Sequence, residues 1–64
     1  MIPKVEYDAA ANAAYIRFSS ASVLESEEIR DGIVLDYDAD GRIVGMELLD
    51  ARRQLPSDLL IKAA

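Results

Sequence analysis

Three side chains that often carry chemistry are missing from this chain of 64 residues, which contains no cysteine, no histidine and no tryptophan. Without cysteine it can form neither a disulfide nor a thiolate metal site. Without histidine it lacks the commonest general base and the commonest metal ligand, so we expect no enzyme activity and no cofactor. A domain this small needs additional stabilisation, which leaves an oxygen-ligated metal or association with another chain.

Positive charge and long apolar runs are also scarce. Lys and Arg number 7 against 12 Asp and Glu, which gives a net charge of -5. Phosphate backbones attract basic surfaces, so binding of nucleic acid by this chain alone is disfavoured. No apolar run approaches the length of a membrane span, and the first residues carry no signal region. We therefore expect no membrane association and a cytoplasmic protein, which the lack of cysteine also fits.

The acidic residues that are present gather in two short groups. One group is Glu25, Glu27 and Glu28, and the other is Asp36, Asp38 and Asp40. Two solvated surfaces that favour solubility are one interpretation of this clustering. A docking face for a basic partner protein is the other.

Alternating apolar and polar side chains, rich in branched and aromatic residues, predict four or five strands. They cover residues 4–7, 14–18, 23–30, 33–37 and 43–49. The 23–30 segment is expected at a sheet edge, because charged side chains commonly guard edges. The Asp31-Gly32 pair is a strong hairpin signal, and Gly41 suits the left-handed position of a second, bulged hairpin loop.

The last part of the chain changes character from strand to helix. Residues 51–55 are good helix formers, Pro56 interrupts them, and Ser57 can cap a final short helix over 58–62. The sequence therefore predicts one domain over residues 1–64. Its class is α+β but mainly β, an antiparallel four- or five-stranded meander with a short C-terminal helical segment.

Residues 36–47 fit a second, incompatible interpretation. They match the calcium-loop pattern D-x-[DN]-x-[DN]-G-x5-E at every position. The ligands would be the side chains of Asp36, Asp38 and Asp40, the backbone carbonyl of Arg42 and the carboxylate of Glu47. Such a loop needs a helix on each side, and the branched residues 33–35 after Gly32 form a poor helix. A hairpin turn is the favoured interpretation, and calcium binding is an alternative.

The hairpin also predicts which side chains share a face of the sheet. A three-residue loop at 39–41 would place Tyr37 opposite Ile43 and Val34 opposite Met46. Both faces would then carry apolar side chains, and the C-terminal residues Leu55, Leu59 and Leu60 could cover only one of them. We therefore expect a homodimer or a higher homo-oligomer. The candidate interface residues are Val34, Val44, Met46 and Leu48.

The same register predicts on which faces of the sheet the carboxylates Asp36 and Glu47 lie. It places Asp36 and Glu47 on opposite faces, so they are not expected to form a catalytic acid–base pair. Glu47 is expected instead to pair with Arg17 or with a tyrosine hydroxyl.

Two segments of the chain resemble a known family. The first is Val5-Glu6-Tyr7-Asp8 followed by Ala13-Ala14-Tyr15-Ile16-Arg17. The second runs from Gly32 through Asp36-Tyr37-Asp38-Ala39-Asp40-Gly41 into Ile43-Val44-Gly45-Met46-Glu47-Leu48-Leu49. They are similar to the small bacterial family catalogued as domain of unknown function 2283, over about residues 4–50. The chain departs from that family at Asn12, where an acidic residue is usual, and at Ala14, where a larger apolar residue is usual.

The resemblance implies neither an activity nor catalytic residues, because the family has none established. The composition and strand pattern favour a non-catalytic, self-associating interaction module. One alternative is an antitoxin-like partner of a basic protein, since the family resembles small companions of toxin genes in size. The other is calcium binding through the 36–47 loop.

Overall fold

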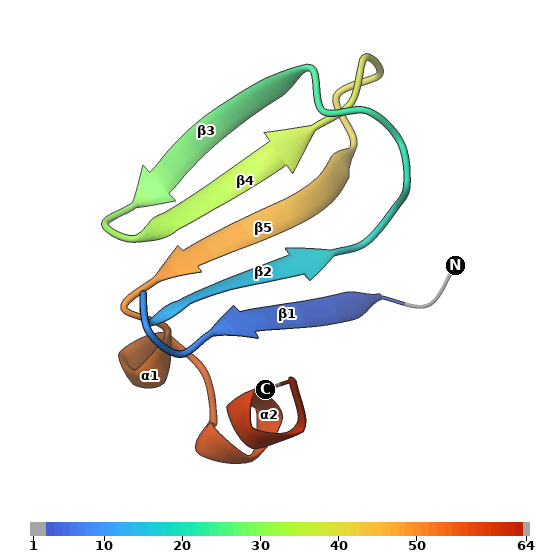
Figure 1. Ribbon diagram of the computed structural model, residues 1–64. Helices are drawn as coiled ribbons and strands as arrows, with labels where there is room; N and C mark the ends of the chain where they lie inside the picture. The colour runs from blue at the N-terminus through green and yellow to red at the C-terminus, as the bar shows by residue number, and fades with distance from the viewer. Residues whose placement is uncertain (1–2, 64) are drawn as a thin grey trace.

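A five-stranded antiparallel sheet followed by two short helices forms the structure (Figure 1), a computed structural model that describes residues 3–63. The strands are β1 (Lys4–Asp8), β2 (Ala13–Arg17), β3 (Glu25–Arg30), β4 (Ile33–Tyr37) and β5 (Ile43–Leu49). The helices are α1 (Ala51–Gln54) and α2 (Ser57–Ala63). The predicted class, mainly β with a C-terminal helical segment, is confirmed. Within residues 3–63, no helix combines the length and the apolar character that a membrane crossing requires.

The strand order differs from a simple meander at one point. The order is β1-β2-β5-β4-β3, so β2 lies beside β5 and not beside β3. The segment between β2 and β3 passes around the end of the sheet to reach its far edge (Figure 1). The physical reason lies in β3, which carries three glutamates and is exposed at every position. Such a strand is tolerated at an edge but not in the middle of a sheet.

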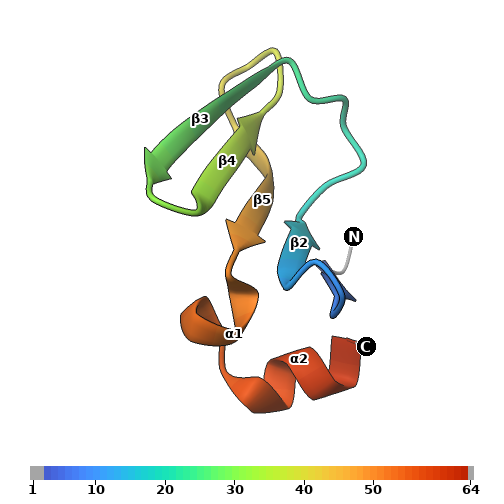
Figure 2. The same cartoon turned by 60° about the vertical axis from the view of Figure 1, so that its left-hand side comes forward.

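Both helices lie toward the β1 end of the sheet (Figure 2), where they cover one face. Packing is mainly between α2 and β1 and between α1 and β5. The core comprises Ala14, Leu48, Ala51 and Leu60, with Tyr7, Ile16, Met46 and Leu55 packed around it. The predicted cover by Leu55 and Leu60 is therefore confirmed. Neither helix forms its main contacts with β3 or β4.

The register of the β4–β5 hairpin agrees with the prediction only at its start. Tyr37 lies opposite Ile43 as expected, but Asp36 then lies opposite Gly45, because a β-bulge shifts the register between Asp36 and Tyr37. The extra residue is Val44, whose side chain is only 2% exposed. Its carbonyl accepts hydrogen bonds from the backbone N–H groups of Phe18 at 2.9 Å and Ser19 at 3.2 Å. Burial of an apolar side chain and two hydrogen bonds stabilise the bulge.

The shifted register changes the composition of both faces, because opposite residues in an antiparallel pair share a face. Leu35 lies opposite Met46 and Val34 lies opposite Glu47, so the predicted pair of Val34 and Met46 is wrong. One face is mainly polar and carries Tyr15, Arg17, Val34, Asp36, Gly45 and Glu47. The other is apolar and carries Ile16, Ile33, Leu35, Met46 and Leu48. Asp36 and Glu47 therefore share a face, contrary to the prediction.

Candidate functional site

The turn between β4 and β5 is a hairpin turn, as the sequence predicted. A carboxylate oxygen of Asp38 accepts hydrogen bonds from the backbone N–H groups of Asp40 at 2.9 Å and Arg42 at 3.0 Å. The N–H of Gly41 donates to the carbonyl of Asp38 at 3.1 Å, and Gly41 has φ of 77°. The Asp38 carboxylate therefore organises the turn through the backbone.

The predicted calcium ligands are not brought together around one point. Asp36 and Glu47 lie on the strands, whereas Asp38, Asp40 and Arg42 belong to the turn. Strands, not helices, flank the loop. Within residues 3–63, no group of three or more acidic, histidine or cysteine side chains is arranged to hold a metal ion.

Asp36 instead belongs to a polar cluster that spans four neighbouring strands. The Tyr15 hydroxyl on β2 donates to Asp36 Oδ2 on β4 at 2.6 Å. The Ser26 hydroxyl on β3 donates to Asp36 Oδ1, also at 2.6 Å. The Tyr15 ring reaches Asp36 across β5 at Gly45, where a Cβ atom would collide with the tyrosine hydroxyl. We call Tyr15, Ser26, Asp36 and Gly45 the Tyr15–Asp36 cluster.

The electrostatics of this cluster favour a neutral phenol. The hydrogen bond to Asp36 raises the pKa of Tyr15 above its ordinary value, and burial raises this pKa further. The Arg17 guanidinium lies 5.4 Å from the centre of the Tyr15 ring and opposes the rise. A neutral phenol that donates to a carboxylate is a structural link, and it is neither a base nor a nucleophile at neutral pH.

Glu47 was predicted to pair with Arg17 or with a tyrosine hydroxyl, but other carboxylates accept the hydrogen bonds of the tyrosines. Asp36 accepts from Tyr15, and Glu27 accepts from the Tyr37 hydroxyl at 3.0 Å. The Glu27 hydrogen bond raises the pKa of Tyr37 as well. Among residues 3–63, the Glu47 side chain forms no hydrogen bond and remains exposed.

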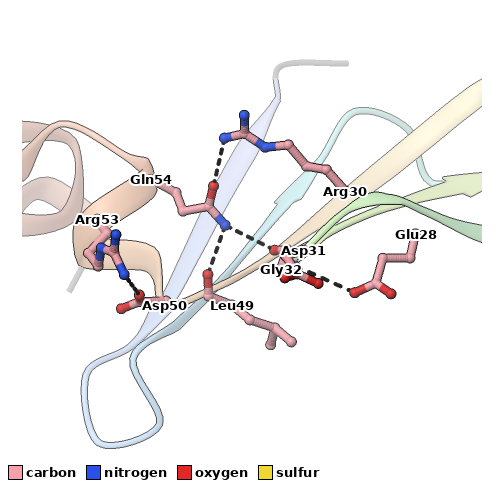
Figure 3. Close-up of a pocket in the computed structure, with 8 residues that line it drawn as sticks. All are labelled: Glu28, Arg30, Asp31, Gly32, Leu49, Asp50, Arg53 and Gln54. Carbon is pink, nitrogen blue, oxygen red and sulfur yellow. Dashed lines mark hydrogen bonds and ion pairs between the residues drawn. The ribbon is translucent and has the colours of Figure 1, made fainter.

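A hollow of about 660 Å³ lies between the β3–β4 turn and α1 (Figure 3). Its lining residues are Glu28, Arg30, Asp31, Gly32, Leu49, Asp50, Arg53 and Gln54. Arg30 donates to Gln54 Oε1 at 3.0 Å, and Arg53 lies 3.5 Å from the Asp50 carboxylate. Both guanidinium groups already have partners here, so the hollow does not single out one charge class of ligand.

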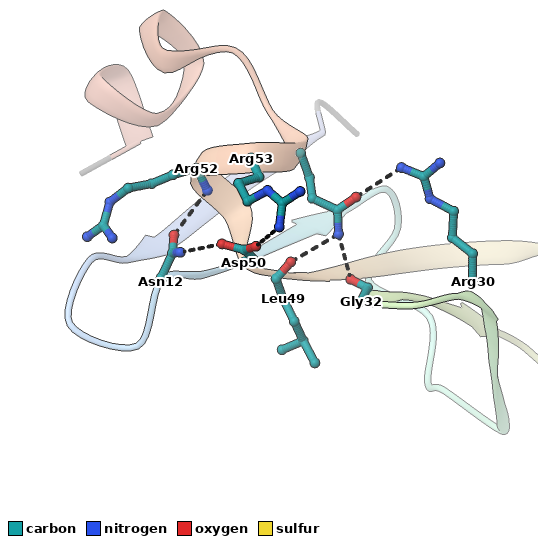
Figure 4. A network of polar contacts seen from close by, with 8 residues as sticks. Asn12, Arg30, Gly32, Leu49, Asp50, Arg52 and Arg53 are labelled. Atoms are coloured by element: carbon teal, nitrogen blue, oxygen red, sulfur yellow. Dashed lines mark hydrogen bonds and ion pairs between the residues drawn. The ribbon is translucent and has the colours of Figure 1, made fainter.

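A second polar network fixes α1 to the rest of the fold (Figure 4). The Asn12 side chain donates to Asp50 Oδ1 at 2.9 Å and accepts from the Arg52 N–H at 3.0 Å. Gln54 Nε2 donates to the carbonyls of Gly32 at 3.2 Å and Leu49 at 3.0 Å. The amide at position 12 can donate to Asp50, which an ionised carboxylate cannot do. Asn12 therefore has a structural role, because it joins the segment after β1 to the start of α1.

The predicted interface residues do not form one open surface. Val44 and Leu48 are only 2% and 3% exposed, so the chain itself buries them. Val34 and Met46 are half-buried and lie on opposite faces of the sheet. The open part of the apolar face consists instead of Ile33, Leu35 and Met46, each half-buried, and we call these three residues the β4–β5 face.

Ile33 and Leu35 were not predicted as surface candidates because the sequence pattern does not reveal the bulge at Val44. A shift of one residue moves every following side chain to the other face. The isolated glycine at position 45 was the available signal for the Tyr15–Asp36 cluster, since such a glycine within a strand often marks a close approach.

Comparison with known families agrees with the resemblance seen in the sequence. A family model described as "Protein of unknown function (DUF2283)" matches residues 4–52. Comparison with curated proteins gave no match, and comparison with solved structures gave none either. The matched region contains all five strands and the start of α1. The chain therefore belongs to the DUF2283 family.

Proposed function

We propose that this domain is a non-catalytic protein-interaction module that associates with a second copy of itself through the β4–β5 face. The observation that carries the proposal is the uneven cover of the apolar face. The helices pack mainly against β1 and β5, and Ile33, Leu35 and Met46 remain half-buried. A second copy placed over these residues would complete their burial.

The small core supports the proposal. Among the described residues, five apolar side chains are buried, and two of them are alanines: Ala14, Val44, Leu48, Ala51 and Leu60. A chain of this length leaves a large share of its apolar surface in water and is marginally stable alone. Complete burial of a leucine or isoleucine contributes about 1.5–3 kcal/mol, so several such residues at an interface can decide whether the domain is folded.

The surface available is also large enough. The described structure exposes 4467 Å². A standard interface buries roughly 800 Å² on each partner, which is about a fifth of this surface. An interface of this size would therefore take up a modest part of the surface.

The test compares two substitutions on this face with a matched one elsewhere. Leu35→Lys and Met46→Lys would place a charge at the proposed interface, whereas Ile61→Lys changes an α2 side chain that is already 76% exposed. We expect light scattering to show that the first two variants dissociate, or unfold, at concentrations where the unmodified protein and Ile61→Lys remain associated. Circular dichroism separates dissociation from unfolding.

Two results would contradict the proposal. One is a folded Leu35→Lys or Met46→Lys variant with the same mass as the unmodified protein. The other is a melting temperature of the unmodified protein that does not change with its concentration, because association that stabilises the fold makes melting concentration-dependent.

A further inference from the structure

The outer edge of β3 is open. β3 is the last strand in the sheet order, and among residues 3–63 it pairs only with β4. All six of its residues are exposed, and Figure 1 shows no helix beside it. Such an edge presents a row of backbone N–H and C=O groups that can pair with another extended chain.

The charge of this edge limits which chain can pair with it. β3 carries Glu25, Glu27 and Glu28 against one cation, Arg30. The ion pairs within residues 3–63 are Lys4–Glu6 and Asp50–Arg53, so none of the three glutamates has a cationic partner there. A second copy of β3 would bring six carboxylates against two guanidinium groups. An extended segment that carries lysine or arginine would instead meet opposite charge.

A hollow at the start of β3 supports a cationic occupant. It measures about 310 Å³ and is lined by Leu24, Glu25, Tyr37, Asp38, Ala39 and Gly41. The lining contains two carboxylates, one aromatic ring and no cationic side chain. An ammonium or guanidinium group on an apolar stem fits this combination, because the ring and the stem pack together while the charge meets the carboxylates. This hollow is adjacent to Glu25, the first residue of the edge.

We propose that the outer edge of β3 binds an extended, lysine- or arginine-bearing segment of another protein as an added strand. The backbone of the segment pairs with residues 25–28, before the irregularity between Glu28 and Arg30. Its basic side chains lie on the face that carries Glu25 and Glu27, and one of them occupies the hollow beside Tyr37. Backbone pairing supplies affinity in this mode of recognition, and side-chain charge selects the partner. The edge is distinct from the β4–β5 face, so this inference does not depend on self-association.

The test uses a short capped peptide that alternates lysine with threonine. We expect it to shift the amide resonances of residues 25–30 and to bind with an affinity that falls as salt is added. Two matched peptides separate the contribution of side-chain charge from that of backbone hydrogen bonding. One replaces lysine with glutamate, and the other keeps lysine but is N-methylated at every residue, which removes the backbone donors on both of its edges. We expect neither of them to shift these resonances.

Substitutions in the protein test whether the glutamates of β3 contribute to peptide binding. Replacement of Glu25 and Glu27 by glutamine keeps side-chain size and should weaken peptide binding about fivefold, the combined effect of two exposed ion pairs. Glu6→Gln, on the opposite edge strand, should leave the affinity unchanged. The proposal is overturned if the N-methylated peptide binds as well as its parent, if the shifts fall on other strands, or if the peptide does not bind at all.

Discussion

Gly45 is a residue whose missing side chain permits a contact between strands. The Tyr15 ring occupies the space above it, with Cζ only 2.6 Å from the position that a Cβ atom would take. We expect Gly45→Ala to destabilise the fold by about 1–3 kcal/mol, because the ring would have to move and lose its hydrogen bond to Asp36. Urea unfolding measures this change.

The same substitution in a Tyr15→Ala variant shows whether the tyrosine ring causes the loss of stability. Tyr15→Ala removes the ring, so adding Gly45→Ala to it should cost far less than adding it to the unmodified protein. The two substitutions are then coupled in a double-mutant cycle. Equal costs in both backgrounds would show that the ring is not what requires glycine at this position.

Tyr15 also predicts how stability depends on pH. Its pKa in the folded protein is raised above the ordinary value of 10.0, chiefly by the Asp36 hydrogen bond. The stabilising contribution of the neutral phenol is therefore fully present below about pH 10 and is lost as pH rises through the folded-state pKa. We expect the difference in unfolding free energy between the unmodified protein and Tyr15→Phe to stay constant from about pH 7 to 9 and to shrink above that range.

Chemical denaturation of both proteins at each pH provides this measurement, and tyrosinate absorption follows the titration directly. Because Tyr37 titrates in both proteins, its own raised pKa cancels in the comparison. A difference that widens as the solution becomes more alkaline would contradict the role given to the Asp36 hydrogen bond.

At the scale of elements, local pairings could be predicted from the sequence and long-range ones could not. Asp31-Gly32 and the 38–41 turn determine two hairpins, since each places the required backbone conformation between two alternating segments. Gly32 and Gly41 have φ of 81° and 77°, as these turns require. The β2–β5 pairing joins residues 28 to 36 positions apart, from Arg17–Gly45 to Ala13–Leu49, and no turn signal specifies it.

The bulge shows why the candidate site could be predicted only in part. Val44 is apolar like its neighbour Ile43, so either residue could face the core, and the pattern does not reveal the extra residue. The predicted register was therefore wrong after the first pair, and it placed Val34 and Met46 on one face although they lie on opposite faces. Asp36 was identified as a notable carboxylate, but its partners Tyr15 and Ser26 come from two other strands that no local pattern relates to it.

The β4–β5 turn provides a prediction at this scale. A Cβ atom on Gly41 would meet nothing within 4 Å, so any cost of substitution there comes from the backbone conformation alone. We expect Gly41→Val to cost about 1–2 kcal/mol, and Gly41→Asn to cost much less because asparagine tolerates this conformation. Thermal or urea unfolding of the two variants tests this order. Equal stabilities would contradict the left-handed conformation at Gly41.

At the scale of the whole molecule, the sheet is covered unevenly. The core and both helices lie toward β1, β2 and the end of β5, whereas neither helix packs mainly against β3 or β4 (Figure 1). The uncovered part has two different surfaces. The β4–β5 face is apolar and suits a second copy, and the β3 edge is acidic and suits a basic segment. The two proposals therefore use separate parts of one exposed half.

Sedimentation of the unmodified protein over a wide concentration range tests whether two copies associate through the β4–β5 face. A 7.0 kDa chain that associates through the β4–β5 face should show a mass that rises with concentration toward at least twice this value. The range should extend to about 1 mM, so that association as weak as ~4 kcal/mol is detected. A well-folded species that stays at 7.0 kDa throughout would contradict the account.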